Sequence, residues 1–178
     1  MSDNFSKSLS IIGSKLILRP IEFGDTENIV RWRNNPKVRE NFIFKEKFTP
    51  EMHLNWMNTK VKNGEVVQFI ITEKCTSNSI GSVYFRDINN EFHSAEFGIF
   101  IGVNEAQGKG YGTEATKLFF DYGFKALKLH RISLRVFERN VAAIKCYETA
   151  GFKREGLFKD MVCFDGIYEN ILFMAKIK

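Results

Sequence analysis

The sequence has few cysteines and prolines and no long apolar run, and each shortage excludes a class of protein. Its three cysteines, Cys75, Cys146 and Cys163, are odd in number and lack both C-x-x-C spacing and a nearby histidine cluster. Neither a disulfide framework nor a metal site is therefore expected, and we expect three small buried residues. No segment approaches the ~20 apolar residues of a membrane span, and the first residues lack the apolar centre of a signal peptide. These absences predict a cytoplasmic protein with no membrane partner.

What the chain does contain is enough apolar surface for a full core. Of its 178 residues, 44% are hydrophobic and 14% are aromatic, with 18 phenylalanines against two tryptophans. This composition excludes a disordered class. No repeat or linker interrupts the chain, so we expect a single domain over residues 1–178.

Hydrophobic periodicity predicts an α/β (α+β) chain with more strands than helices. Asp25 and Asn140 are expected helix N-caps, and Asp165-Gly166 is a strong hairpin signal. Alternating residues predict strands over 15–21, 66–73, 79–87, 92–103, 131–137, 153–164 and 168–177. Periods of three and four predict helices over 25–32, 49–62, 115–126 and 140–151.

A glycine-rich turn between a strand and a helix is the most informative segment. It reads Gln107-Gly108-Lys109-Gly110-Tyr111-Gly112, followed by Thr113. Without β-carbons, such a turn can aim several N–H groups at one anion, and the following helix adds the positive end of its dipole. The spacing fits neither the dinucleotide fingerprint nor the P-loop. An ordinary strand-to-helix turn is the alternative explanation.

A second motif strengthens the phosphate-binding interpretation. Asn140, Ala143, Tyr147, Gly151 and Phe152 follow the turn with the spacing Asn-x-x-Ala-x-x-x-Tyr-x-x-x-Gly-Phe. Together with Gln-x-x-Gly-x-Gly and the order of predicted elements, this resembles the GCN5-related N-acetyltransferase (GNAT) superfamily over residues 15–177. Three further motifs resemble its RimJ/RimL-type branch, namely Leu18-Arg19-Pro20, Trp32-x-Asn34-x-Pro36 and Asp165-Gly166-x-Tyr168.

The resemblance implies a fold, a co-substrate and a binding site. The fold is a mixed central sheet of about seven strands flanked by about four helices, and the co-substrate is acetyl-CoA, with no metal. The strand before the turn would offer free main-chain groups to pantetheine and to the thioester oxygen. N–H groups of the turn would hold the pyrophosphate, with lysine charge nearby. The implied cofactor-binding residues are Phe100, Ile101, Val103, Gln107, Gly108, Lys109, Gly110, Tyr111, Gly112, Thr113, Asn140, Ala143, Lys145 and Tyr147.

Acetyl transfer to an amine also needs a neutral amine and a stabilised thiolate leaving group. The resemblance nominates Tyr147 as the acid or hydrogen-bond donor toward the sulfur, although its apolar helix face also suits a core tyrosine. Glu96 is the candidate base, because the strand period directs it toward the acceptor side. A salt-bridged surface carboxylate is the alternative for Glu96, and His93 and Glu105 are weaker candidates for the base.

The acceptor is the least constrained part of the prediction. The net charge is +5, and its one concentration lies between Arg31 and Lys47. A solvated helix face explains this stretch, yet it also points to Arg31 and Trp32 as acceptor contacts, beside Glu96 on its strand. A protein N-terminus is the leading acceptor, with a nucleotide-linked amino sugar or a polyamine as alternatives. A non-catalytic acetyl-CoA-binding or nucleic-acid-binding module is the competing class, although nucleic acid is not expected. A homodimer is left open.

Overall fold

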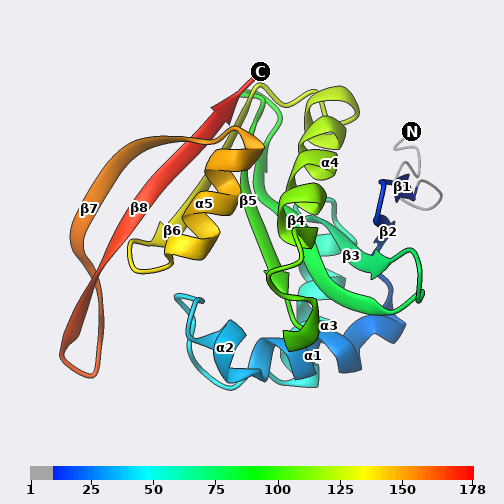
Figure 1. Cartoon of the computed structure of the whole chain (residues 1–178), viewed down its shortest axis with the longest axis horizontal. Helices are drawn as coiled ribbons and strands as arrows, with labels where there is room; N and C mark the ends of the chain where they lie inside the picture. Colours follow the sequence, from blue (N-terminus) through cyan, green and yellow to red (C-terminus); the bar gives the residue numbers. More distant parts are fainter. Residues whose placement is uncertain (1–9) are drawn as a thin grey trace.

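The computed structural model describes residues 10–178, which form one sheet of eight strands with helices on both faces (Figure 1). The strand order is β1-β2-β3-β4-β5-β6-β8-β7, and every pair is antiparallel except β5 with β6. The strands are β1 (Ile11–Ile12), β2 (Leu16–Pro20), β3 (Val67–Glu73), β4 (Ser79–Asn89), β5 (Ser94–Ile101), β6 (Arg131–Phe137), β7 (Lys153–Phe164) and β8 (Ile167–Ile177).

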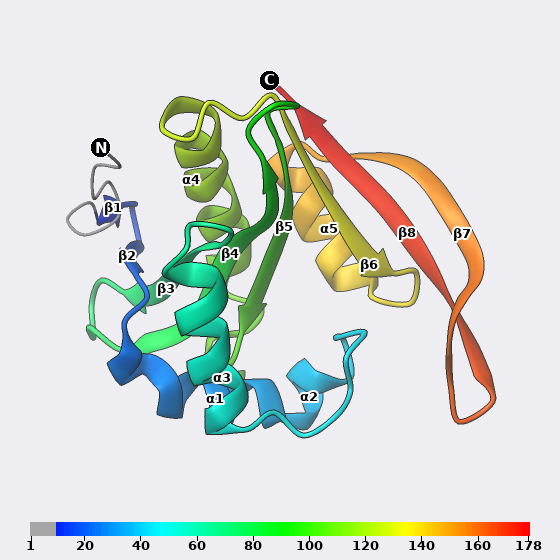
Figure 2. The same cartoon turned by 180° about the vertical axis from the view of Figure 1, so that it is seen from behind.

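The helices lie in two layers. α4 and α5 cover one face of the sheet, and α1 and α3 lie against the other, as the front and back views show (Figures 1 and 2). The helices are α1 (Thr26–Asn34), α2 (Pro36–Arg39), α3 (Pro50–Trp56), α4 (Tyr111–Lys125) and α5 (Val141–Ala150), and a π-helical turn (Met57–Val61) continues α3. The predicted α/β architecture is confirmed. The short β1 and α2 were not predicted, because two- and four-residue elements show no period.

Aromatic side chains fill the layer between the sheet and α4. Phe85 stacks on Phe119 with ring centroids 4.3 Å apart, and Phe69 meets Phe119 edge-on at 5.4 Å. On the opposite face a smaller cluster forms around Trp32, Ile70 and Phe100. Burying the large side chains of both clusters supplies most of the hydrophobic stabilisation.

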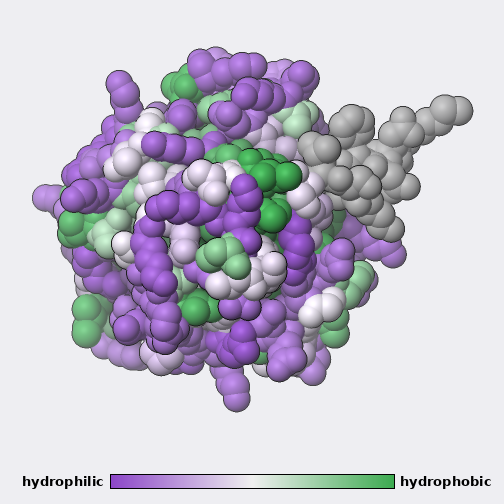
Figure 3. All heavy atoms as spheres, turned by 45° about the vertical axis from the view of Figure 1, so that its right-hand side comes forward, coloured by the Kyte–Doolittle hydropathy of each residue, from purple (hydrophilic) through white to green (hydrophobic). Residues whose placement is uncertain are grey.

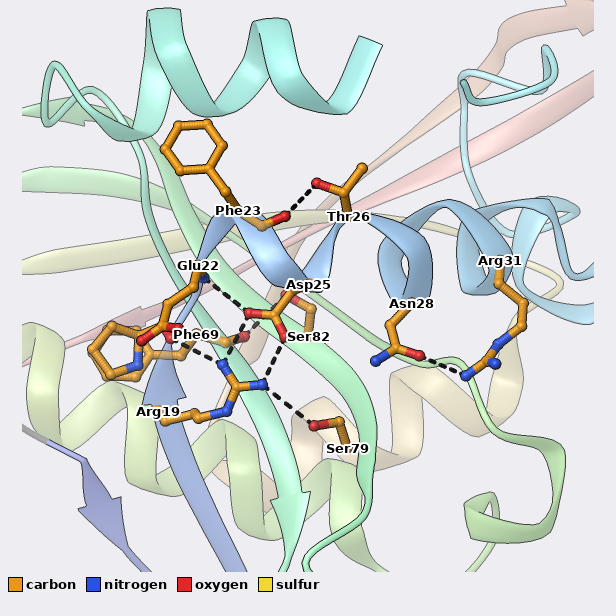
Figure 4. A network of polar contacts seen from close by, with 11 residues as sticks. Arg19, Glu22, Phe23, Asp25, Thr26, Asn28, Arg31, Phe69, Ser79 and Ser82 are labelled. Atoms are coloured by element: carbon orange, nitrogen blue, oxygen red, sulfur yellow. Dashed lines mark hydrogen bonds and ion pairs between the residues drawn. The ribbon is translucent and has the colours of Figure 1, made fainter. Parts of the chain in front are cut away.

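An ion pair joins β2 to the start of α1 (Figure 4). Arg19 donates from Nη1 and Nη2 to the two carboxylate oxygens of Asp25, at 2.9 and 2.6 Å, and the Glu22 N–H donates to the same carboxylate at 2.9 Å. Asp25 precedes α1 as predicted, but its side chain does not cap that helix. The buried carboxylate instead fixes where α1 leaves the sheet.

The sheet opens between its two central strands. β5 and β6 pair only where Ser94, Ala95 and Glu96 face Arg131, Ile132 and Ser133. Beyond Glu96, β6 continues to pair with β8 while β5 has β4 alone, and the two strands diverge in both views (Figures 1 and 2). The parallel pair is therefore split along most of its length, which leaves one edge of β5 unpaired in the middle of the sheet.

The described surface is mostly polar. The face in Figure 3 is largely hydrophilic, with hydrophobic residues in small patches. Cys75 and Cys163 are exposed and Cys146 is half-buried, so the expectation of three buried cysteines is wrong. Among residues 10–178, no helix combines the length and the apolar character that crossing a membrane requires.

Candidate functional site

A cleft of about 1130 Å³ runs through the opening in the sheet. One half is lined by the glycine turn and by α5, and the other by α1, α2 and the segment that joins α2 to α3. We call these the donor half and the acceptor half. Between them the cleft passes residues 96–101 of β5, so a molecule bound on one face of the sheet can reach a molecule bound on the other.

The glycine turn lies at one end of the donor half. It leads into a helix that has no side-chain cap within the described chain. Gly108 and Gly110 have φ values of 75° and 82°, a backbone conformation that favours glycine. Gly110 is the N-cap of the 15-residue α4, and no side chain of residues 10–178 caps the first turn of this helix. Its N–H groups therefore face the cleft beside Gly112 and Thr113. A helix start of this kind suits an anion, and pyrophosphate binding by this turn stays a prediction.

The open edge of β5 presents main-chain groups to the same cleft. The Gly102 N–H donates to the Ile80 carbonyl at 2.8 Å, and this contact determines which residues of β5 hydrogen-bond to β4. Along an antiparallel strand, the main-chain N–H and C=O groups of successive residues point alternately toward one neighbouring strand and away from it. Phe97, Ile99 and Ile101 therefore direct theirs away from β4. A side-chain contact agrees with this alternation, because the Gln107 Nε2 donates to the Ile101 carbonyl at 3.1 Å.

The direction of the β5 main-chain groups corrects two sequence predictions. Phe100 directs its main-chain groups into the β4 ladder, opposite Ser82, so only its side chain faces the cleft. Val103 lies outside the cleft, and its N–H donates to the Ile80 carbonyl at 3.2 Å. Of the three residues expected to offer free main-chain groups, only Ile101 directs such groups away from β4, and its carbonyl already accepts from Gln107.

α5 forms the other wall of the donor half. The Asn140 Oδ1 accepts from the Ala143 N–H at 3.1 Å, so Asn140 caps the helix as predicted. Lys145 lines the donor half, whereas Lys109 is exposed and does not line the cleft. That Lys109 adds charge near the nucleotide stays a prediction.

Tyr147 projects from α5 into the cleft at the open edge of β5. Its ring meets Phe97 edge-on at a centroid distance of 6.2 Å and Phe152 at 5.8 Å. Burial raises the pKa of its hydroxyl well above the usual value for tyrosine, with smaller contributions from Cys146 and Tyr84. The hydroxyl therefore stays protonated and can act as a donor near a thioester placed in the opening.

Glu96 lies in the acceptor half, where two arginines hold its carboxylate. Arg86, directly opposite on β4, donates from Nη2 to Glu96 at 2.5 Å, and the Arg135 Nη2 on β6 lies 3.0 Å from the same carboxylate. The salt-bridged alternative thus describes its contacts, and its role as base stays a prediction. His93 and Glu105 are exposed and lie outside the cleft.

The two acceptor contacts predicted on α1 are misplaced. Trp32 is buried in the core, 1% exposed, and meets Phe100 edge-on at 6.4 Å. Arg31 donates to the Asn28 Oδ1 at 2.6 Å on α1 (Figure 4), and both residues line a separate, smaller pocket and not the cleft. Arg33 lines the cleft instead. The helical period could have predicted the position of Arg33, because Arg33 is four residues after the buried Ile29 and so shares its face.

The segment between α2 and α3 is fastened over the acceptor half at both ends. Asn34 pairs with both main-chain groups of Phe48, donating at 2.7 Å and accepting at 2.9 Å. On the opposite side, Arg139 donates to the Glu40 carbonyl at 2.6 Å, and Lys45 pairs with Glu169 of β8 at 3.2 Å. These contacts tie the acceptor half to the β7–β8 hairpin, so the cleft has a defined wall.

Comparisons with known proteins agree with this geometry. The profile of the acetyltransferase (GNAT) domain family matches residues 15–153. The chain is 32% identical over 160 residues to spermidine N(1)-acetyltransferase of Vibrio cholerae, covering 90% of this chain and 91% of the relative. It is 33% identical over 158 residues to the Escherichia coli K12 spermidine N(1)-acetyltransferase, covering 89% and 83%.

A solved structure extends the likeness to the fold. The Vibrio cholerae spermidine N-acetyltransferase in complex with CoA and spermine superposes with a TM-score of 0.86 at 30% identity, covering 93% of this chain and 96% of that chain. These relatives are spermidine acetyltransferases, so the finer assignment to the RimJ/RimL-type branch gains no support. The chain is an acyltransferase enzyme that belongs to the GNAT acetyltransferase family.

Proposed function

We propose that this enzyme transfers the acetyl group of acetyl-CoA to a primary amine of a small molecule by direct attack on the thioester. The observation that carries the proposal is the continuous cleft. It joins an uncapped helix start, an unpaired strand edge and the Tyr147 hydroxyl to a second binding space on the other face of the sheet.

The chemistry follows from the two halves. An amine in the acceptor half attacks the thioester carbonyl carbon, a C–N bond forms and the C–S bond breaks. The N–H groups of Phe97, Ile99 or Ile101 suit the oxygen that becomes negative, because they lie on the open edge. Tyr147 donates a hydrogen bond to the departing sulfur, and Glu96 or water receives the proton that the amine loses.

The acceptor class is supported by similarity. The relatives named above are spermidine acetyltransferases, which favours a polyamine over the protein N-terminus expected from the sequence. A small amine also suits an acceptor half that is walled by the fastened segment between α2 and α3.

A thiol-release assay tests the proposal. Purified enzyme is mixed with acetyl-CoA and, separately, with spermidine, spermine, aminoglycosides, amino sugar phosphates and short peptides, and acetylated products are identified by mass spectrometry. We expect amine-dependent release of CoA with at least one small amine. Release with peptides alone would contradict the small-molecule acceptor. Binding of acetyl-CoA without release on any amine would favour a non-catalytic binding protein.

A further inference from the structure

The cleft carries more positive charge than its own carboxylates can neutralise. The charged side chains that line it comprise five cations and two carboxylates, namely Arg33, Lys37, Arg86, Arg135 and Lys145 with Glu40 and Glu96. Of these, only Lys145 belongs to the donor half. The surplus therefore lies in the acceptor half, where a polycationic amine would be repelled.

Two of these arginines share one carboxylate. Arg86 and Arg135 approach Glu96 from the strands on either side of β5, so a single negative charge stands between two guanidinium groups. Asp87 lies 3.7 Å from the Arg86 Nε, but its side chain is 74% exposed and compensates little charge. The Arg86 Nε is buried and has no hydrogen-bond partner among residues 10–178.

Arg33 has no carboxylate partner within the described chain. Its guanidinium stacks on Phe42, with Cζ 3.3 Å from the ring centroid, and Phe48 lies on a second side at 5.2 Å. Its Nη1 is buried and without a hydrogen-bond partner among residues 10–178. Burial lowers the pKa of Arg33 to about 10, which reflects the cost of holding this charge without a counter-ion.

We infer that the acceptor carries a phosphate or carboxylate group beside its amine, and that Arg33, with Arg86 and Arg135, binds this anionic group. The inference rests on the proposed transfer to a small amine. It selects an anionic acceptor in place of the polyamine that similarity to the relatives favours. The guanidinium that stacks on Phe42 lines the cleft, and the edge of a guanidinium pairs bidentately with phosphate or carboxylate. A nucleotide-linked amino sugar, one of the acceptors left open by the sequence, has this chemistry.

Matched pairs of amines test the inference. Glucosamine is compared with glucosamine 6-phosphate, and propylamine with β-alanine, in the thiol-release assay, with spermidine alongside. We expect kcat/KM to be ~10-fold or more higher for the anionic member of at least one pair, because charge-assisted bidentate contacts are strong. The first pair reports a phosphate and the second a carboxylate.

The variant series assigns the preference to Arg33. Arg33→Met should abolish the advantage of the anionic member while the KM for acetyl-CoA stays unchanged, and Arg33→Lys should restore part of it. Arg31→Met is the matched control, because Arg31 lies two residues away on the same helix and does not line the cleft. This control should keep the full preference.

A binding measurement separates this inference from the proposed function. Calorimetric titration of glucosamine 6-phosphate and of β-alanine into the CoA-loaded enzyme should detect binding of at least one, and Arg33→Met should weaken it ~10-fold or more. Equal turnover within both pairs, or spermidine as the best acceptor with Arg33→Met unchanged or faster, would overturn the anionic subsite and leave the acetyl transfer intact. Absence of turnover on every amine would count against the proposed function alone, provided that the calorimetric difference persists.

Discussion

Replacing Tyr147 with phenylalanine removes one hydroxyl from the cleft and leaves the ring contacts in place. Because a phenyl ring keeps the edge-on packing against Phe97 and Phe152, the variant should fold as the wild type does. The loss therefore isolates what the hydroxyl does in the reaction. The raised pKa of Tyr147 means that this hydroxyl is protonated throughout a normal assay range.

The size of the effect follows from comparing acid strengths. A thiol has a pKa near ~8.5 and an unperturbed phenol near ~10, so transferring a proton from tyrosine to the thiolate runs uphill by at least ~2 kcal/mol. Burial of Tyr147 makes this transfer harder still. Tyr147 should act by donating a hydrogen bond to the forming thiolate. Such a bond to a charged group contributes ~1.5–3 kcal/mol, which corresponds to a fall in kcat of ~10- to 100-fold.

The assay is steady-state thiol release with saturating acceptor, together with CoA binding by calorimetry. Tyr122→Phe is the matched control, because Tyr122 packs against Phe69 and Phe119 outside the cleft and burial raises its pKa in the same direction. We expect kcat to fall only in Tyr147→Phe, with CoA affinity nearly unchanged. Wild-type turnover in that variant, or an equal loss in Tyr122→Phe, would refute the reasoning.

Three further predictions concern the base, the packing of the acceptor half and its anchoring. Glu96→Gln should lower kcat/KM by ~100-fold or more, and wild-type kcat/KM in this variant would exclude Glu96 as the base. Gly98→Ala should lower stability by ~1–3 kcal/mol, because its new Cβ would lie 2.2 Å from the Tyr84 ring, whereas Gly24→Ala meets nothing within 4 Å and serves as the control in denaturant unfolding. Arg139 and Lys45 lower the pKa of Glu169 below its ordinary value of 4.5. The stability that these ion pairs contribute is therefore fully present above pH 4.5 and is lost as the pH falls through the folded-state pKa of Glu169. Glu169→Gln should therefore cost ~1 kcal/mol at pH ~7 and almost nothing at pH ~2, and an equal cost at both would contradict the assignment.

The elements and the glycine turn were predictable because their signals are local. Alternation over residues 131–137 and the spacing of Gly108 and Gly110 each depend on a few neighbouring residues. The open main-chain groups of β5 were not predictable in the same way. Their direction is set by the Gly102–Ile80 contact, which joins two strands across a hairpin. A shift of one residue in this alternation would place the outward main-chain groups on Phe100 instead of Ile101.

The acceptor half was the least predictable part because its residues come from distant segments. Glu96 meets Arg86 and Arg135 only after three strands have paired, and no spacing along the chain announces that cluster. The basic stretch that begins at Arg31 pointed to α1, and Arg33 of this helix lines the cleft. The face of that helix was assigned wrongly, since a run of charges does not show which member faces the core. Ile29 and Trp32, both buried, define the inner face and bring Arg33 to the cleft.

The unpaired edge of β5 also bears on self-association. An exposed strand edge is a template on which another chain can add a strand and so begin aggregation. Here the edge is internal, because the diverging β6 and the helix α5 stand on its open side. A linear molecule that lies in the cleft can satisfy these main-chain groups. The fold thus offers backbone hydrogen bonding to a ligand at an edge that its own elements flank, and not at the outer rim of the sheet.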